Sequence, residues 1–344
     1  MAPSEPDALS LLVLVTPHFN MAATVGFIDP FRAANYLEGR SRFRWQIASL
    51  RGGACIASNG MTIDTLPLAE VQQGNRDFVI VSSSWTPEAY KSSPLHTSLW
   101  RWAGQGATMG GLDTGAFILA EAGLLKNRRA TVHYEHIDAM QELYPNVTVS
   151  EELFVFDGTR ITCCGGAASV DFALHIIKGT HGDALANAAA RYVFHQNVRP
   201  QGAMQSPGLA EPMGQLAPSA VKRAIRLMEE NLEAPLSIPE ICESIRLSQR
   251  QLNRLFARYV KKTPTLYYRD IRLDRARGLV TQTEMPLVEV AVASGFSSQV
   301  HFSRAYRERF GLSPRSDRIE GRVPFEFRAW PMHRTKKDTQ ARPE

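Results

Sequence analysis

The stretch LSIPEICESIRLSQRQLNRLFARY, residues 236–259, decides the fold of the C-terminal part of this 344-residue chain, because its pattern occurs twice. The second copy spans 286–310, and the chain around its end reads GFSSQVHFSRAYRERFGLSPR, residues 295–315. The matched pairs are Ile238 and Leu287, Glu240 and Glu289, Ile241 and Val290, Leu247 and Phe296, Leu252 and Phe302, Arg254 and Arg304, and Phe256 and Tyr306. Their separation grows from 49 to 50 residues after the turn, as one extra turn residue would produce. Two helix-turn-helix units would present two recognition helices.

Both helices of the first copy have a start signal. Ser237 with Glu240, and Ser248 with Gln251, have the spacing of a capping box, so a helix is predicted to begin after each serine. The turn between them is expected at 245–247. The second helix carries an apolar stripe at spacings of three and four, formed by Leu252, Leu255, Phe256 and Tyr259.

The other face of this second helix has the chemistry for reading DNA. An α-helix fits the major groove, where arginine donates two hydrogen bonds to guanine and asparagine pairs with adenine. Arg250, Asn253 and Arg254 have these groups at one-turn spacing, and Arg258 follows them. The equivalent face of the second copy holds Gln299, Val300, His301 and Arg304, while Phe302, Tyr306 and Phe310 form its core side. The alternative, that these arginines only solvate a helical bundle, leaves the repeat unexplained.

The charge is unevenly divided along the chain. Residues 1–218 hold 15 Lys and Arg against 19 Asp and Glu, a net charge of −4. Residues 219–318 hold 18 against 11, a net charge of +7, and residues 319–344 hold 6 against 4, a net charge of +2. The polyanionic partner is therefore expected to bind the C-terminal region alone.

Composition indicates a soluble protein of two or three domains. Hydrophobic residues make up 44% and charged residues 21%, and no apolar run approaches the roughly 18 residues of a membrane span. The first ten residues have two acids and no base ahead of LLVLV, so we expect no secretory signal, no membrane partner and a cytoplasmic location. Four cysteines, Cys55, Cys163, Cys164 and Cys242, lack paired spacing. We expect reduced thiols, no metal and no cofactor.

The N-terminal half alternates strand-like and helix-like stretches. Strands are predicted at 11–15, 44–49, 78–82, 107–112, 130–134 and 160–164, and helices at 22–37, 95–104, 115–125, 136–143, 168–178 and 182–196. This order favours a doubly wound α/β fold with a parallel sheet. Four prolines and three glycines over 197–219 predict a linker. The expected domains are 9–196 and 220–318, the second all-α with tandem helix-turn-helix units, followed by a flexible tail at 319–344.

One strand-to-helix junction stands out in the first domain. Residues 107–125 read ATMGGLDTGAFILAEAGLL, a buried strand, a sharp turn at Asp113 and a helix. Such an elbow exposes a nucleophile at the end of a sheet and directs helix N–H groups at what binds there. Here the position holds a carboxylate, which favours binding over covalent hydrolysis.

The C-terminal residues resemble the AraC/XylS family of transcription regulators over about 220–318. The likeness rests on LSQRQLNRLF (247–256), YYRDIRLDRARGLV (267–280) and AVASGFSSQVHFSRAYRERFGLSPR (291–315). It implies a seven-helix domain in which a connecting helix near 265–281 holds two recognition helices for double-stranded promoter DNA. The family's groove-facing positions match Arg250, Asn253, Arg254, Gln299, His301 and Arg304, whereas Val300 stands where a polar residue is frequent.

The N-terminal residues resemble the PfpI-type, class I glutamine-amidotransferase-like superfamily, with a flavodoxin-like fold, over about 9–196. The likeness rests on the elbow, on ATVHYE (130–135) and on TCCGGAASVDF (162–172), and the fusion to an AraC-type domain is that of GlxA-type regulators. Enzymatic members have cysteine where this chain has Asp113, and some have an acid near Ala22 and Ala23. His133 matches the histidine that faces the elbow.

This second resemblance implies a sensor. Several GlxA-type regulators respond to amino-acid derivatives such as arginine or to quaternary ammonium compounds such as glycine betaine and carnitine. The negative charge of a buried Asp113 would compensate the positive charge of such a ligand. Trp85 follows the strand FVIVSSS, where its ring could meet such a cation. The expected protein is a transcription activator, a homodimer by resemblance, with RNA polymerase as a further candidate partner.

Each of these three residues has a structural alternative. Asp113 could only cap the following helix, His133 could be a core histidine, and Trp85 could only pack. Two other functions fit the same sequence features. One is an amidase or deglycase with an appended DNA-binding domain, rescued by Cys163 or Cys164, and the other is an architectural DNA binder without a ligand.

Overall fold

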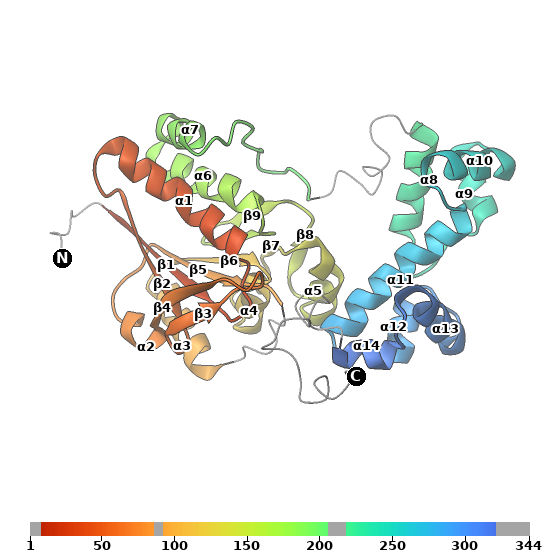
Figure 1. The fold of residues 1–344 in the computed structure, drawn as a ribbon, viewed down its shortest axis with the longest axis horizontal. Coiled ribbons are helices and arrows are strands. Elements are labelled where there is room, and N and C mark those ends of the chain that lie inside the picture. The colour runs from red at the N-terminus through yellow and green to blue at the C-terminus, as the bar shows by residue number, and fades with distance from the viewer. Residues whose placement is uncertain (1–7, 86–91, 206–217, 321–344) are drawn as a thin grey trace, which may run out of the picture. The chain divides into compact units, whose positions relative to one another are not determined.

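The computed structural model describes residues 8–85, 92–205 and 218–320, with side chains to residue 318, and Figure 1 draws the fold. The described residues form two compact units, an N-terminal unit up to residue 205 and a C-terminal unit from residue 218. The first is α/β and the second is entirely helical, which confirms the predicted fold class.

The N-terminal unit is built on an eight-stranded sheet of order β3-β4-β2-β1-β5-β6-β10-β9. Six neighbouring strands, in the order β4, β2, β1, β5, β6 and β10, run parallel, as in a doubly wound flavodoxin-like sheet. The strands are β1 (Leu9–Val15), β2 (Phe43–Ser49), β3 (Gly53–Ile56), β4 (Thr62–Pro67), β5 (Phe78–Ser83), β6 (Thr108–Asp113), β9 (Phe154–Asp157) and β10 (Arg160–Cys163).

The sheet departs from the predicted parallel arrangement only at its two edges, where strands that were not predicted are added. Strand β3 pairs antiparallel with β4, and β9 pairs antiparallel with β10. The reason is the length of the connections, since only Gly158 and Thr159 separate β9 from β10. A connection of two residues makes a hairpin, whereas a parallel pair needs a crossover of a dozen residues or more.

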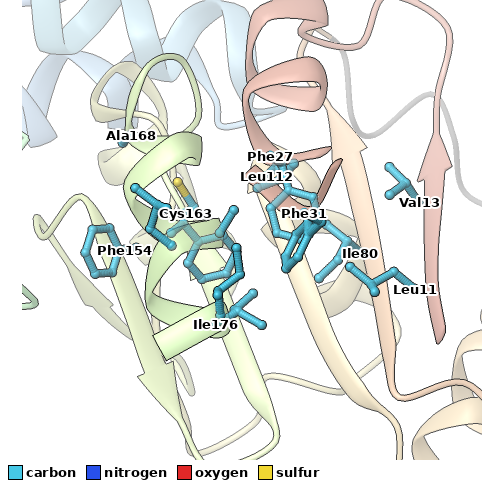
Figure 2. Close-up of a cluster of buried hydrophobic side chains, with 14 of the residues drawn as sticks. Leu11, Val13, Phe27, Phe31, Ile80, Leu112, Phe154, Cys163, Ala168 and Ile176 are labelled. Carbon is cyan, nitrogen blue, oxygen red and sulfur yellow. The ribbon is translucent and has the colours of Figure 1, made fainter. Parts of the chain in front are cut away.

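Helices cover both faces of this sheet. On one face lie α1 (Met21–Glu38), α6 (Ala168–His181) and α7 (Asp183–Tyr192), and Figure 2 shows side chains of α1 and α6 packed against the strands. The other face is covered by α2 (Leu68–Val71), α3 (Ser93–Gly104), α4 (Gly115–Glu121) and α5 (Ile137–Leu143). Two apolar cores result, one on each side of the sheet, which explains why its central strands read as continuous apolar runs.

The strand predicted at 130–134 is shorter and lies outside the main sheet. Strand β7 (Arg129–Thr131) pairs with β8 (Thr148–Ser150) in a separate two-stranded sheet, and a single turn, Tyr134–His136, follows it. The backbone N–H of Thr131 donates to the side-chain hydroxyl of Thr162, and its own hydroxyl donates to the carbonyl of Glu152. Side-chain hydrogen bonds thus replace a longer backbone ladder here.

Residues 197–205, which composition assigned to the linker, are fastened to the N-terminal unit. The fully buried carboxylate of Asp171 accepts hydrogen bonds from His195 Nε2 (2.7 Å), from the Arg199 backbone N–H (2.8 Å) and from the Arg199 guanidinium. Gln205 Nε2 donates to the Thr131 hydroxyl (2.9 Å) and to the Val132 carbonyl (2.8 Å). Proline and glycine exclude helix here, but side-chain hydrogen bonds still fix the path. The rest of the predicted linker, 206–217, and the tail from 321 lie outside the described residues.

The C-terminal unit has seven helices within its described part, as the AraC/XylS resemblance implied. They are α8 (Ser219–Glu230), α9 (Ile238–Ile245), α10 (Gln249–Tyr259), α11 (Pro264–Gln282), α12 (Leu287–Ala293), α13 (Gln299–Phe310) and α14 (Pro314–Glu320). The long helix α11 contributes its first half to a core shared with α8, α9 and α10, and its second half to a core shared with α12 and α13. No helix in the described ranges is long and apolar enough to cross a membrane.

Candidate functional site

The elbow predicted at Asp113 is present at the carboxyl end of β6. Asp113 has a φ of 58°, a left-handed conformation that is costly for a residue other than glycine and that recurs at functional sites. Helix α4 begins two residues later at Gly115, where a side chain would lie 2.0 Å from the carbonyl oxygen of Val81. This close approach of the turn to β5 requires glycine at position 115.

The Asp113 carboxylate is buried and held by two neighbouring elements. It is 4% exposed, and its Oδ2 accepts hydrogen bonds from Asn20 Nδ2 (2.8 Å) and from Ser84 Oγ (3.4 Å). Burial raises the pKa of Asp113 to about 6, while the charge of His133 and these two hydrogen bonds act in the opposite direction. The result is a carboxylate that is costly to bury without a cation nearby.

The hydrogen bonds of Asp113 differ from those of a helix cap. Thr114 occupies the N-cap position of α4, and its hydroxyl donates to the carbonyl of Ser84. Oδ2 of Asp113 accepts from α1 and from the end of β5, so this oxygen joins elements of the sheet edge. The capping alternative for Asp113 has no hydrogen bond to support it among the described residues.

Two site residues were missed from the sequence. Asn20 caps α1 by accepting from the Ala23 N–H (3.1 Å), and its amide simultaneously donates to Asp113. His18 has a φ of 63°, and its ring centroid lies 6.4 Å from that of Trp85. Asn20 directly before a helix could have been recognised as a cap, but its second partner lies 93 residues away.

The three predicted effector residues lie at or follow strand ends of this unit. Trp85 stands two residues beyond Ser83, the residue of β5 that pairs in register with Asp113. His133 follows β7, is half-buried, and is near enough to Asp113 for its charge to lower the pKa of that carboxyl. Their contact with an effector stays a prediction.

Cys163 is a poor replacement for the missing nucleophile. Cys163 is fully buried, and Figure 2 shows its sulfur within the hydrophobic cluster between α6 and the sheet. Burial raises the pKa of Cys163 well above its usual value, so its thiolate, the form that attacks, is disfavoured. The side chain of the neighbouring Cys164 is also buried.

In the C-terminal unit both predicted capping boxes are present. Ser237 and Glu240 exchange hydrogen bonds at the start of α9, and Ser248 and Gln251 do so at the start of α10. The six predicted groove-facing residues are all exposed: Arg250, Asn253, Arg254, Gln299, His301 and Arg304. Leu252 and Phe256, and in the second copy Phe302 and Tyr306, are fully buried on the opposite faces. Base contact by the exposed set stays a prediction.

Comparisons with known proteins match both units. The DJ-1/PfpI family matches residues 10–179, and the Helix-turn-helix domain family matches residues 241–318. The chain is 39% identical over 306 residues to the HTH-type transcriptional regulator CdhR of Pseudomonas aeruginosa, covering 89% of this chain and 90% of that protein. It is 32% identical over 303 residues to the HTH-type transcriptional regulator GlxA of Rhizobium meliloti, covering 88% and 93%.

A solved structure shows the same kind of fold. The THiJ/PfpI family protein from Pseudomonas syringae aligns with 71% of this chain and 96% of its own, with a TM-score of 0.50 and 19% identity. The chain is therefore a transcriptional regulator in which a DJ-1/PfpI domain precedes an AraC-type helix-turn-helix domain. It belongs to the GlxA-type regulators, which confirms the predicted resemblance. Its relatives are named as regulators, although the DJ-1/PfpI fold also includes enzymes.

Proposed function

We propose that this regulator activates transcription in response to a small cationic metabolite, such as arginine, glycine betaine or carnitine. The cation binds beside Asp113, with His133 and Trp85 as further contacts. The C-terminal unit engages double-stranded promoter DNA through α10 and α13, and the protein acts as a homodimer on RNA polymerase without catalysing a reaction.

The buried, strained carboxylate of Asp113 is the observation that carries the proposal. Its φ of 58° and its anchoring by Asn20 and Ser84 hold the group at the carboxyl edge of the sheet, the edge at which open α/β sheets bind ligands. Strain and burial both cost free energy, so they persist where the surrounding structure uses the group. A cation would compensate the carboxylate charge and leave no need for a nucleophile.

Binding of the cation is tested by thermal unfolding of the full chain with arginine, glycine betaine, carnitine and an uncharged analogue of each, followed by tryptophan fluorescence. A ligand present at about 100 times its Kd should stabilise the protein by about 2.7 kcal/mol, a rise in Tm of about 5 to 10 °C. Asp113→Asn should abolish the rise, and Asp64→Asn, which changes an exposed carboxylate on β4, should preserve it.

Two results would refute the sensor. One is the absence of a Tm rise with all three cations, which favours a ligand-independent architectural role. The other is an equal rise in the Asp113→Asn variant, which moves the binding site elsewhere. A hydrolytic activity lost in Cys163→Ser or Cys164→Ser would revive the enzyme alternative.

Coupling to DNA is measured separately. An effector regulates only when it binds two protein states with different affinities, so the operator affinity of the full chain should change in its presence. A gel-shift titration with and without the stabilising cation measures this change. If a cation binds but leaves the operator affinity unchanged, the site at Asp113 has no regulatory role. Transcription in vitro shows whether the bound effector activates or represses.

A further inference from the structure

We propose that His133, Glu135 and His136 form a binding site for one divalent transition metal ion of the Zn²⁺, Cu²⁺ or Ni²⁺ class. One nitrogen from each imidazole and one carboxylate oxygen all lie within 4.8 Å of one another. His133 Nδ1 and Glu135 Oε2 are 3.9 Å apart. The site shares His133 with the proposed effector contacts, but it is tested in the absence of any effector.

The backbone brings the two imidazoles to one side. His133 precedes the turn Tyr134–His136, and the N–H of His136 donates to the carbonyl of His133 at 2.8 Å. The ring centroids of His133 and His136 lie 6.1 Å apart. The turn is anchored on both sides, by β7 before it and by α5 after it. Only the side chains need to adjust for the ligand atoms to converge.

The size of that adjustment is small. Zinc binds imidazole nitrogen and carboxylate oxygen at about 2.0 to 2.2 Å, so two ligands of a tetrahedral ion lie roughly 3.3 Å apart. The ligand atoms already lie within 4.8 Å of one another, so each pair has to close by at most about 1.5 Å (4.8 minus roughly 3.3 Å).

The donor set selects the class of ion. Two imidazoles and one carboxylate suit zinc, copper and nickel, whereas calcium and magnesium prefer oxygen ligands alone. Both histidines are half-buried and Glu135 is exposed, so the ion would keep open positions toward solvent. The buried Asp113 feels the charges of both His133 and Glu135, and it adds a second negative charge near the ion.

This site departs from the expectation that the protein binds no metal. That expectation rested on cysteine spacing, which does not report histidine and carboxylate ligands. The stretch HYEH at 133–136 supplies three ligands within four residues, and their convergence depends on the turn they form.

The test uses the full-length chain freed of any affinity tag. Isothermal titration with Zn²⁺, Cu²⁺ and Ni²⁺ should give one ion per chain, and Mg²⁺ and Ca²⁺ should give none. Because changes in outer-shell partners alone weaken metal sites by about 10- to 100-fold, losing a direct ligand in His136→Ala or Glu135→Gln should weaken binding by at least about 10-fold. His96→Ala and Glu142→Gln, outside the cluster, should bind as the unchanged protein does.

Two outcomes would overturn the site. One is no stoichiometric binding of any of the three ions, and the other is binding that survives in His136→Ala. Electron paramagnetic resonance of the Cu²⁺ form should show nitrogen coordination that decreases in His136→Ala, and unaltered thermal unfolding of the ion-free variant shows that it folds. Since these titrations contain no effector, their failure leaves the cation sensor untouched, and a failed effector screen leaves the metal site untouched.

Discussion

The two helix-turn-helix copies share one sequence pattern but are stabilised by different interactions. In the first copy each helix begins with a complete capping box, at Ser237 and at Ser248. In the second copy α12 has Pro286 at its N-cap and no side-chain cap, and Ser298 caps α13 with a single hydrogen bond of 3.5 Å. Local hydrogen bonds therefore define the helices of the first copy more strongly than those of the second.

The second copy is held by contacts between distant residues. The fully buried carboxylate of Asp317 in α14 accepts from the Tyr306 hydroxyl (2.8 Å) and from Arg277 Nε (2.9 Å). Arg309 of α13 pairs with Asp270 (3.0 Å) and Asp274 (2.7 Å) of α11. These contacts fasten α13 to its neighbours.

The turns differ in the same way. Arg246 and Gly295 stand at equivalent positions and both are left-handed, with φ of 58° and 73°. Only the second turn is closely packed, because a side chain at Gly295 would lie 2.4 Å from the carbonyl oxygen of Leu232. The same helix-turn-helix pattern can thus be maintained by local capping in one copy and by tertiary packing in the other.

The largest effect is expected from Asp317→Ala. It leaves the buried Tyr306 hydroxyl without its acceptor and Arg277 without its partner, which should cost about 2 to 4 kcal/mol. Hydrogen exchange of the full chain, read by mass spectrometry, should accelerate over 286–318 and change little over 237–259. Equal acceleration of exchange in both copies would contradict the view that they are stabilised differently. Asp317→Asn keeps a hydrogen-bond acceptor, so it should lose less stability than Asp317→Ala.

Gly295→Ala should have the second-largest effect, a decrease of about 2 to 3 kcal/mol in the free energy of unfolding. The added methyl group would clash with the backbone, and the left-handed φ is strained for alanine. Arg246→Ala is the matched control in the first copy, where the native residue already carries this strain, and its effect on the free energy of unfolding should be within about 0.5 kcal/mol. Urea unfolding measures both, and similar losses would remove the distinction between the turns.

The DNA-facing surfaces give the third prediction. Arg254→Ala should weaken binding to a specific operator by about 1 to 3 kcal/mol and relax specificity there. Val300→Ala, on the equivalent face of the second copy, removes an exposed apolar side chain and should have a smaller effect. Gel-shift titration with specific and altered operators measures both, and unchanged affinity and footprint for Arg254→Ala would argue against α10 as a recognition helix.

The smallest effect concerns the caps. Ser248→Ala should cost about 1 kcal/mol because it removes the hydroxyl that accepts from the Gln251 N–H and donates to Gln251 Oε1 at the start of α10. Ser298→Ala removes only the long hydrogen bond to His301 N–H and should cost less, about 0.5 kcal/mol. The urea unfolding midpoints of the two variants, at constant m-value, compare their losses of stability. A larger loss in Ser298→Ala than in Ser248→Ala would show that local capping is not what distinguishes the first copy.

Sequence predicted the features that depend on neighbours in the chain. Both capping boxes involve residues three apart, and the strand, turn and helix around Asp113 are continuous. The elbow could therefore be predicted, together with its missing nucleophile. So could the seven helices, once the resemblance was recognised.

Features that depend on distant partners could not be predicted. Asn20 reaches Asp113 across 93 residues, and Arg277 reaches Asp317 across 40. The predicted linker includes residues that are fixed to the N-terminal unit. Proline and glycine indicate the absence of helix, but they do not reveal the hydrogen bonds that Arg199 and Gln205 make. Antiparallel sheet edges were missed because β3 and β9 have only four residues each.

The position of Asp317 near the end of the C-terminal unit has a consequence for the order of folding during synthesis. The core of the first copy uses side chains from Val221 to Ile271, so it is complete when residue 271 has been added. The second copy needs Tyr306 for its core and Asp317 for its buried acceptor. At translation rates of about 5 to 20 residues per second, the first copy gains a lead of roughly 2 to 9 seconds. The chain thus offers its second half an already folded surface on which to assemble.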